Sequence, residues 1–256
     1  MKKITFKLRH ILVMALLGST LLLGACSSTN DILGTAGKVL EGLNNGSGNG
    51  NKVTTQQIIG GLKQALELGI TKGSKKVAVN NGYLGNSLIK IPFPEDAIKV
   101  ANTLKTLGMG KQVDKVVTSL NRAAEDAAKS AAPIFVSAIK QMSIKDAMGI
   151  LKGNNNAATD YLQRTTSTQL KAAFTPSIKT SLKKVDATKI WGDVMNTYNK
   201  LPTTRNKINP DLTDYVTNRA MDGLFQMVSK EEAKIRKDPV ARTTDLLKKV
   251  FKLQDK

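Results

Sequence analysis

The stretch KQVDKVVTSLNRAAEDAAKS, residues 111–130, decides the fold class of this chain. Apolar side chains recur in it every three or four residues, which is the spacing of one face of an α-helix. These side chains are Val113, Val116, Val117, Leu120, Ala124 and Ala127. The charged residues between them, Arg122, Glu125, Asp126 and Lys129, are spaced to form ion pairs one turn apart. The stretch therefore predicts an amphipathic helix with these charged residues on its solvated face.

Helical patterns continue on both sides of this stretch. Upstream, Thr54 is placed to cap a helix with apolar residues at Ile58, Ile59, Leu62, Leu66 and Ile70. Glycines inside that helix weaken it, so we expect close helix packing at Gly60, Gly61 and Gly69. A second helix is expected to begin at Pro94 and to stop at Gly108 and Gly110.

Downstream, further helices are expected to begin near Ser143, Asn156, Asp186, Asn209, Ser229 and Asp238. Within the domain, only residues 80–94 predict a non-helical segment, because Asn80-Asn81-Gly82 signals a turn and Pro92 and Pro94 forbid a continuous helix. The expectation is an all-α, compact multi-helix domain of about nine to eleven helices, covering residues 54–256.

Residues 1–25 have the organisation of a lipoprotein signal peptide. Four basic residues, Lys2, Lys3, Lys7 and Arg9, precede an apolar run that starts at Ile11 and ends in LGAC, residues 23–26. The run is too short to span a bilayer, which needs about 20 apolar residues. We expect cleavage before Cys26 and lipid attachment at Cys26. Ser27 follows where aspartate is the usual inner-membrane retention signal, which favours the periplasmic face of the outer membrane.

Residues 26–53 predict a lipidated N-terminus followed by a flexible tether. The segment NNGSGNGN, residues 44–51, has too little apolar surface to bury and is typical of a linker. A flexible chain of this length has an end-to-end distance of about 30 Å. The tether therefore allows the domain either to lie on the membrane that holds Cys26 or to stand off it.

Composition excludes several kinds of chemistry. The chain carries +19, and removal of the leader takes away four basic residues and leaves +15. It also removes His10, the only histidine, while Cys26 is the only cysteine. The mature protein then lacks the residues for Cys-His or Ser-His-Asp catalysis, histidine metal ligands and disulfides.

The positive net charge of the chain indicates which binding partners to expect. It favours anionic envelope components, namely phospholipid headgroups, lipopolysaccharide or acidic peptidoglycan, unless the lysines only solvate the surface. Nucleic acid is not expected, since aromatic residues make up 4% of the chain and no nucleic-acid-binding motif occurs.

Candidate catalytic patterns are weak. Ser87-Leu-Ile-Lys90 and Ser181-Leu-Lys-Lys184 match S-x-x-K, but the S-x-N and K-T-G motifs that accompany it downstream are missing. The carboxylates considered as cation ligands, Asp146, Asp160, Asp186, Glu231 and Glu232, are not grouped in a calcium-binding loop. Arginines on apolar helices, Arg122, Arg164 and Arg219, favour structural ion pairs with Glu125 or Asp160.

Several segments together resemble a known family. They are NRAAEDAAKSAAP at 121–133, GILKG at 149–153, ATDYLQRTT at 158–166, MDGLF at 221–225 and EEAKIR at 231–236. On these residues the chain resembles the bacterial domain of unknown function 4197, over about residues 55–252. The resemblance implies an all-helical domain in exported proteins, many of them lipoproteins. It implies no activity and no catalytic residues.

The sequence thus predicts an outer-membrane lipoprotein with a non-enzymatic binding or structural role. Cys26 is its single site residue, with no catalytic, cofactor or metal ligand expected. Its partners are the membrane through Cys26, anionic envelope components or another envelope protein. One alternative is a carrier of an apolar ligand or lipid, with a pocket lined by residues such as Phe135, Phe174, Trp191 and Phe225. A less favoured alternative is a hydrolase that uses carboxylates such as Glu125 or Asp160.

Overall fold

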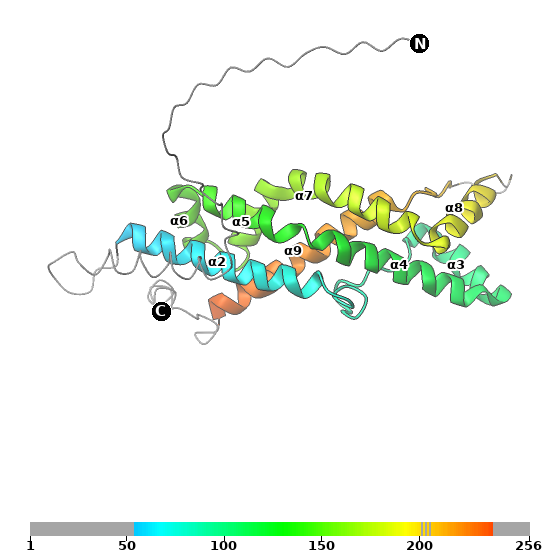
Figure 1. Cartoon of the computed structure of the whole chain (residues 1–256), viewed down its shortest axis with the longest axis horizontal. Helices are drawn as coiled ribbons and strands as arrows, with labels where there is room; N and C mark the ends of the chain where they lie inside the picture. Colours follow the sequence, from blue (N-terminus) through cyan, green and yellow to red (C-terminus); the bar gives the residue numbers. More distant parts are fainter. Residues whose placement is uncertain (1–53, 201, 203, 205, 238–256) are drawn as a thin grey trace, which may run out of the picture. The chain divides into compact units, whose positions relative to one another are not determined.

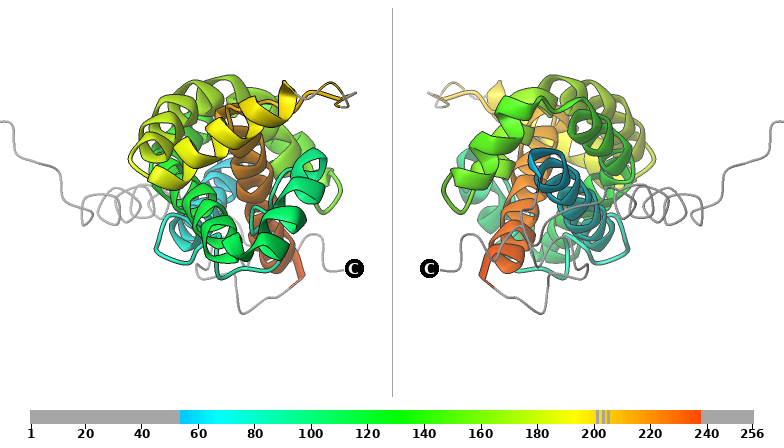
Figure 2. Two further views of the ribbon diagram at one scale, coloured as in Figure 1. Left: turned by 90° about the vertical axis from the view of Figure 1, so that its right-hand side faces the viewer. Right: turned by 90° about the vertical axis from the view of Figure 1, so that its left-hand side faces the viewer.

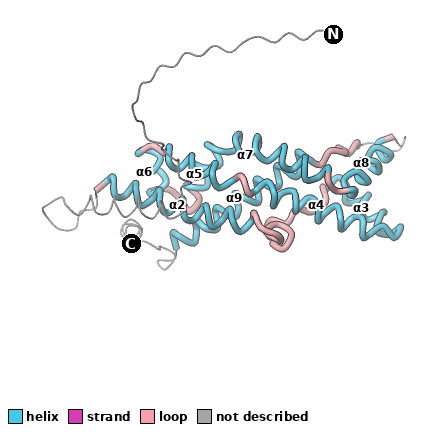
Figure 3. The backbone as a smooth tube through the Cα atoms, in the orientation of Figure 1, coloured by secondary structure: helices cyan, strands magenta, loops and turns pink. Residues whose placement is uncertain are grey.

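The computed structural model describes residues 54–200, 202, 204 and 206–237. Residues 53–256 form one compact unit. The described part of that unit is built from helices and loops, without a β-strand (Figure 3). The expected signal peptide, Cys26, the tether and the helix start at Asp238 lie outside the described residues. None of the described helices is long and apolar enough to cross a membrane.

The helices follow one another along the chain with short connections. They are α2 (Thr55–Val77), η1 (Glu95–Ala97), α3 (Ile98–Leu104), η2 (Lys105–Met109), α4 (Gly110–Ala128), α5 (Ala131–Gln141), α6 (Ile144–Lys152), α7 (Ala157–Lys183), α8 (Asp186–Asn199) and α9 (Thr213–Lys237). Six of these have 11 or more residues, and α3 and α6 are shorter α-helical segments. The all-α fold is confirmed for the described residues. The expected count of nine to eleven helices is wrong, because the described residues contain only six helices of 11 or more residues.

One expected helix boundary does not exist. The sequence places a capping serine at Ser229, but α9 continues through it to Lys237. Glu231 and Glu232, expected in the first turn of a new helix, are instead buried in the C-terminal part of α9. Glu231 forms an ion pair with Lys76 of α2, a partner 155 residues away. A local capping pattern is overridden here because the same side chains have tertiary partners.

Other predicted helix signals are confirmed. Thr54 and Gln57 form a capping box at the start of α2, and Ser143 and Asp146 form one at the start of α6. The apolar face predicted for residues 111–130 is buried in α4, except that Val117 is half-buried. Gly108 breaks the chain between α3 and α4 with φ of 81°, a conformation that favours glycine.

Helix α9 lies in the middle of the arrangement, with α2, α4 and α7 packed against it (Figures 1 and 2). The close packing expected at Gly69 is confirmed, because a Cβ there would lie 2.7 Å from Cδ1 of Ile235 on α9. The same expectation at Gly60 is wrong, since a Cβ there would meet nothing within 4 Å. Gly61 is buried.

The non-helical segment predicted at residues 80–94 is confirmed as a loop that packs on α4 and α9. Its side chains at Tyr83, Ile89, Ile91 and Phe93 are buried. Gly223 of α9 permits this approach, because a Cβ there would lie 2.8 Å from Cε1 of Tyr83 and 3.1 Å from Cβ of Ile89. The loop is therefore part of the core, and its backbone polar groups need partners there.

Candidate functional site

The first candidate site is the charged face of α4, beside the loop. Glu125 was expected in solvent and is instead 4% exposed. One of its carboxylate oxygens, Oε1, accepts the backbone N–H groups of Tyr83 and Leu84, each at 3.1 Å. The other, Oε2, accepts from Arg122 at 2.6 Å. The solvated-face prediction is wrong for Glu125 because the loop covers that side of α4.

Arg122 and Asn81 complete this group. Arg122 also donates to Oδ1 of Asn81 at 2.9 Å. Asn81 has φ of 66°, a left-handed conformation that asparagine tolerates better than most residues. The pairing of Arg122 with Glu125 agrees with the structural ion pair predicted from the sequence. Its role is to hold the start of the loop against α4.

Asn121, one turn before Glu125, fixes a second point of the loop. Its Oδ1 accepts the backbone N–H of Ile91 at 2.8 Å, and its Nδ2 donates to the Ile91 carbonyl at 2.8 Å. The same amide also donates to the Val117 carbonyl of α4. Asn121 is fully buried, so these bonds replace water for backbone groups that no helix or strand satisfies.

Tyr83 ties the loop to α9. Its ring is fully buried, and its hydroxyl donates to the Ala220 carbonyl at 2.6 Å. Burial, together with the negative charges of Glu125 and Asp222, raises the pKa of Tyr83 well above its ordinary value. The hydroxyl is therefore a fixed hydrogen-bond donor at neutral pH.

A hollow of about 160 Å³ lies beside this group. It is lined by Ala78, Val79, Asn80, Arg122, Glu125, Asp126 and Lys129. Its charges are already paired, since Lys129 donates to Asp126 at 2.8 Å and Arg122 to Glu125. The Lys129 ammonium holds the pKa of the Asp126 carboxyl below its ordinary value. Glu125 and Asp126 are thus each engaged by a basic partner, which does not suit an acid–base pair.

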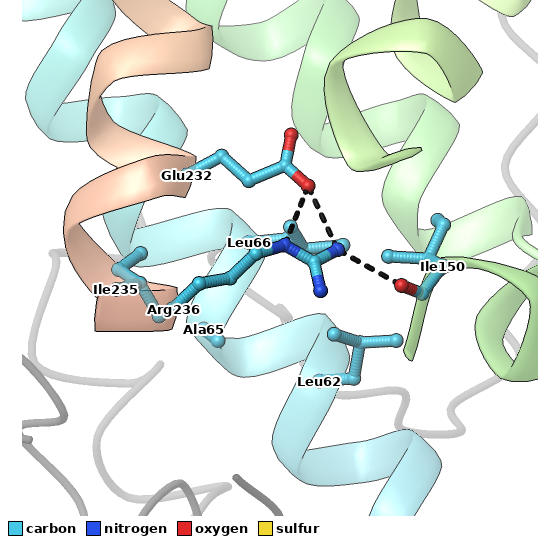
Figure 4. Close-up of a pocket in the computed structure, with 7 residues that line it drawn as sticks. All are labelled: Leu62, Ala65, Leu66, Ile150, Glu232, Ile235 and Arg236. Atoms are coloured by element: carbon cyan, nitrogen blue, oxygen red, sulfur yellow. Dashed lines mark hydrogen bonds and ion pairs between the residues drawn. The ribbon is translucent and has the colours of Figure 1, made fainter. Parts of the chain in front are cut away.

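A second buried group lies where α9 meets α6 and α7 (Figure 4). Glu232 accepts the backbone N–H groups of Ala158 and Thr159 at 3.0 and 2.9 Å, in the first turn of α7. Arg236 donates to Glu232 at 2.8 Å and to the Ile150 carbonyl near the end of α6 at 2.9 Å. One ion pair therefore satisfies a helix N-terminus and a helix C-terminus together.

This arrangement changes the role expected for Asn156. Asn156 occupies the N-cap position of α7, but its side chain makes no capping hydrogen bond. Glu232 satisfies the first turn from α9 in its place. The adjacent hollow in Figure 4 has a volume of about 10 Å³, close to the space one water needs. It has no room for a larger ligand.

The other charged residues considered from the sequence do not come together in one site. Asp146 caps α6, and the Ser143 hydroxyl holds its pKa below the ordinary value. Asp160 and Asp186 are exposed, and the described residues contain no group of three or more cysteine, histidine, aspartate or glutamate side chains placed to hold a metal. Arg164 lies 4.0 Å from Asp146 and 5.7 Å from the centre of the Tyr161 ring.

The S-x-x-K serines have structural surroundings. Ser87 lies in the loop, where its side chain is exposed. Ser181 of α7 donates to Asp126 of α4 at 3.2 Å. This bond links two helices and uses the hydroxyl that the motif would need as a nucleophile.

The aromatic residues proposed as pocket lining belong to the core. Phe135, Phe174, Trp191 and Phe225 are all buried. Phe135 packs edge-on against Phe225 at 5.7 Å, and Trp191 against Phe93 of the loop at 4.8 Å, measured between ring centres. Neither of the two hollows described above is lined by any of them.

Sequence reasoning did not single out Asn121, Tyr83 or Arg236 as key residues. Each acts on the backbone of a segment distant in the chain, namely Ile91, Ala220 and Ile150. Sequence spacing reports neighbours on one helix and carries no signal for such partners.

The described residues thus define a class: an all-helical domain whose buried polar side chains hold its own loops and helix ends. The chain belongs to the family described as "Protein of unknown function (DUF4197)", whose model matches residues 52–252. The family resemblance noted in the sequence is confirmed. No curated protein and no solved structure matches the chain significantly.

Proposed function

We propose that this protein is a lipid-anchored, non-enzymatic binding module of the bacterial envelope, with an anionic envelope component as its partner. The observation that carries this proposal is the charge of the surface. Among the described residues, exposed lysines and arginines are more than twice as numerous as exposed aspartates and glutamates. A surface of this kind attracts anionic partners over distances of about a Debye length, ~8–10 Å at physiological salt.

The positions of the acidic residues add to the imbalance. Glu125, Glu231 and Glu232 are all buried, where each pairs with a basic side chain. Of those partners, Arg236 is itself largely withdrawn from solvent, whereas Lys76 is 47% exposed. Withdrawing these three carboxylates leaves the surface more basic than the composition alone indicates.

Two other interpretations have less support. A hydrolase would need a carboxylate free to exchange protons in a cleft, whereas Glu125 binds two backbone N–H groups and Arg122, and Asp160 lies exposed on α7. A carrier would need an enclosed apolar cavity, whereas the four aromatic residues expected to line it are packed in the core.

Anchoring is tested in cells by metabolic labelling with radioactive palmitate and by fractionation of the membranes. We expect label in the wild-type chain and no label in Cys26→Ser, which should also leave the outer-membrane fraction. Label retained in Cys26→Ser, or a wild-type chain without label, would contradict the anchor.

Binding is tested with the purified full-length protein in mild detergent. Pelleting assays with peptidoglycan sacculi, and binding of the immobilised protein to lipopolysaccharide or to mixed micelles that contain phosphatidylglycerol, should show binding to at least one of these anions at low salt. The affinity should fall at least tenfold when salt is raised from about 0.05 to about 0.5 M, because screening weakens contacts between exposed charges. Binding that does not change with salt, or binding to none of these anions, would overturn the proposal.

A further inference from the structure

The corner between α3 and α4, residues 105–111, carries the most exposed large apolar side chain of the described residues. Leu107 is 70% exposed, against 57% or less for each of the others. Lys105, Thr106 and Lys111 around it are exposed, and Met109 is half-buried. A single exposed leucine is common on protein surfaces, so a binding role for Leu107 has to be argued from the backbone and the charges around it.

The backbone of this corner is irregular. Residues Lys105–Met109 form a π-helical turn, and Gly108 within it has a positive φ of 81°. A Cβ at Gly108 would meet nothing within 4 Å, so no packing against the rest of the domain calls for a glycine. Glycine is required here because the chain turns, and the turn leaves Leu107 on the outside.

The charge of this corner has one sign. Lys99, Lys105 and Lys111 lie in the segment 97–113, which contains no aspartate or glutamate. Leu68 and Ile190 differ in this respect, since Leu68 follows Glu67 and Ile190 lies between Asp186 and Asp193. Val79 and Leu88 also lie in a segment without an acidic residue, 68–94, but they are less exposed than Leu107, at 54% and 52%. An exposed apolar side chain with exposed lysines on both sides in the sequence combines the two features that interfacial segments present to anionic lipid, an apolar side chain and basic neighbours.

We infer that the corner 105–111 docks on an anionic phospholipid surface, with Leu107 entering the boundary between headgroups and acyl chains. Lys105 and Lys111 flank it at the level of the phosphates. This inference rests on the proposed anchor at Cys26, because one leucine and a few lysines give only weak, reversible binding by themselves. The anchor would supply the high local concentration that makes such a contact effective.

The position of the corner is compatible with this role. The corner lies at the right-hand end of the helices in Figure 1, whereas α2 begins towards the left. The segment from Ser27 to Val53 has 27 residues, which span up to about 90 Å when extended. This reach allows the corner to contact the bilayer that holds Cys26.

The test uses the full-length lipoprotein, reconstituted in vesicles of phosphatidylethanolamine with phosphatidylglycerol and in vesicles of phosphatidylcholine alone. A Leu107→Cys variant carries an environment-sensitive fluorophore, and lipids with nitroxides on their acyl chains act as quenchers. Leu68→Cys, at an exposed leucine on α2 beside Glu67, is the matched control. The wild-type chain, whose only cysteine is Cys26, is treated with the same fluorophore as a control. It should remain unlabelled, because an acylated Cys26 has no free thiol.

We expect quenching at position 107 to be several-fold stronger than at position 68 in the anionic vesicles. It should fall to the control level in phosphatidylcholine, and also when Lys105→Glu and Lys111→Glu are added. Equal quenching at both positions, with the protein still in the vesicle fraction, would overturn this inference and leave the anchor intact. Wild-type protein that floats free of the vesicles, or that is labelled at Cys26, would instead contradict the proposed anchor.

Discussion

The Glu125 carboxylate joins α4 to the loop through two backbone N–H groups and to Arg122 through an ion pair. Replacing it with alanine leaves the N–H groups of Tyr83 and Leu84 without an acceptor inside the core. An unpaired buried polar group costs about 1–3 kcal/mol. The residue is therefore expected to matter for stability rather than for chemistry.

We expect Glu125→Ala to lower the free energy of unfolding by about 3 kcal/mol, because a buried and a part-buried backbone N–H group and one arginine lose this partner. Asp126→Ala is the matched control on the next position. Asp126 is exposed and pairs with Lys129 at the surface, so its loss should cost less than about 1 kcal/mol. Urea unfolding followed by circular dichroism measures both values. Equal effects of the two substitutions would contradict this account of the loop.

Tyr83 gives a prediction on pH. Its pKa is raised in the folded state, so the unfolded chain loses this proton first when the pH passes about 10. Its contribution to stability is then complete below that pH and is lost as the pH rises further. Wild-type protein should lose about 1.4 kcal/mol per pH unit more than Tyr83→Phe above pH ~10. At neutral pH, Tyr83→Phe should lower the free energy of unfolding by about 1 kcal/mol, because the hydrogen bond to the Ala220 carbonyl is lost.

Urea titrations at neutral pH and above pH ~10 test this, with Tyr83→Phe as the internal reference. Because the lysines titrate equally in both proteins, only the difference between them reports on Tyr83. If the free energy of unfolding of the two proteins changed in parallel with pH, the Tyr83 hydroxyl would not be buried and hydrogen-bonded to Ala220 as described.

At the scale of elements, glycines within helices separate into two kinds. Gly60 of α2 has open space around it, whereas Gly223 of α9 lies directly under Tyr83 and Ile89 of the loop. The sequence shows the same residue type in both helices. What a Cβ would meet differs because only one of the two positions faces another segment.

Gly60→Ala should raise the free energy of unfolding by up to about 1 kcal/mol, since alanine favours the helix. Gly223→Ala should lower it by about 1–3 kcal/mol, because the added Cβ forces the loop away from α9. Thermal unfolding of the two variants, made in the same background, provides the comparison. A stabilising Gly223→Ala would mean that the loop does not pack on α9 as closely as described.

At the scale of the whole molecule, residues 53–256 form a single compact unit. Trp191, the only tryptophan, is buried against Phe93 of the loop, so its fluorescence reports on tertiary packing. We expect denaturant transitions followed by this fluorescence and by far-ultraviolet circular dichroism to coincide, because one core supports all the helices. A fluorescence change at clearly lower denaturant would mean that α8 and the loop unfold before the rest.

The sequence by itself determined the all-α class, the family, the helix starts at Thr54 and Ser143 and the non-helical segment at 80–94. These features depend on side-chain periodicity, capping residues and proline or glycine, all of which act within a few residues. The lipid anchor at Cys26 stays a prediction of the sequence.

Only the tertiary structure decided what Glu125, Asn121 and Glu232 do. The spacing of Glu125 and Glu232 indicates a solvated and a capping position, and the sequence gives no signal for Asn121. Each of the three nevertheless accepts from or donates to the backbone of a segment far along the chain. The continuous α9 has the same cause, because buried partners outweigh a local capping signal. Buried backbone groups of a loop or helix end must be satisfied by whatever side chain folding brings near them, and that pairing is a property of packing.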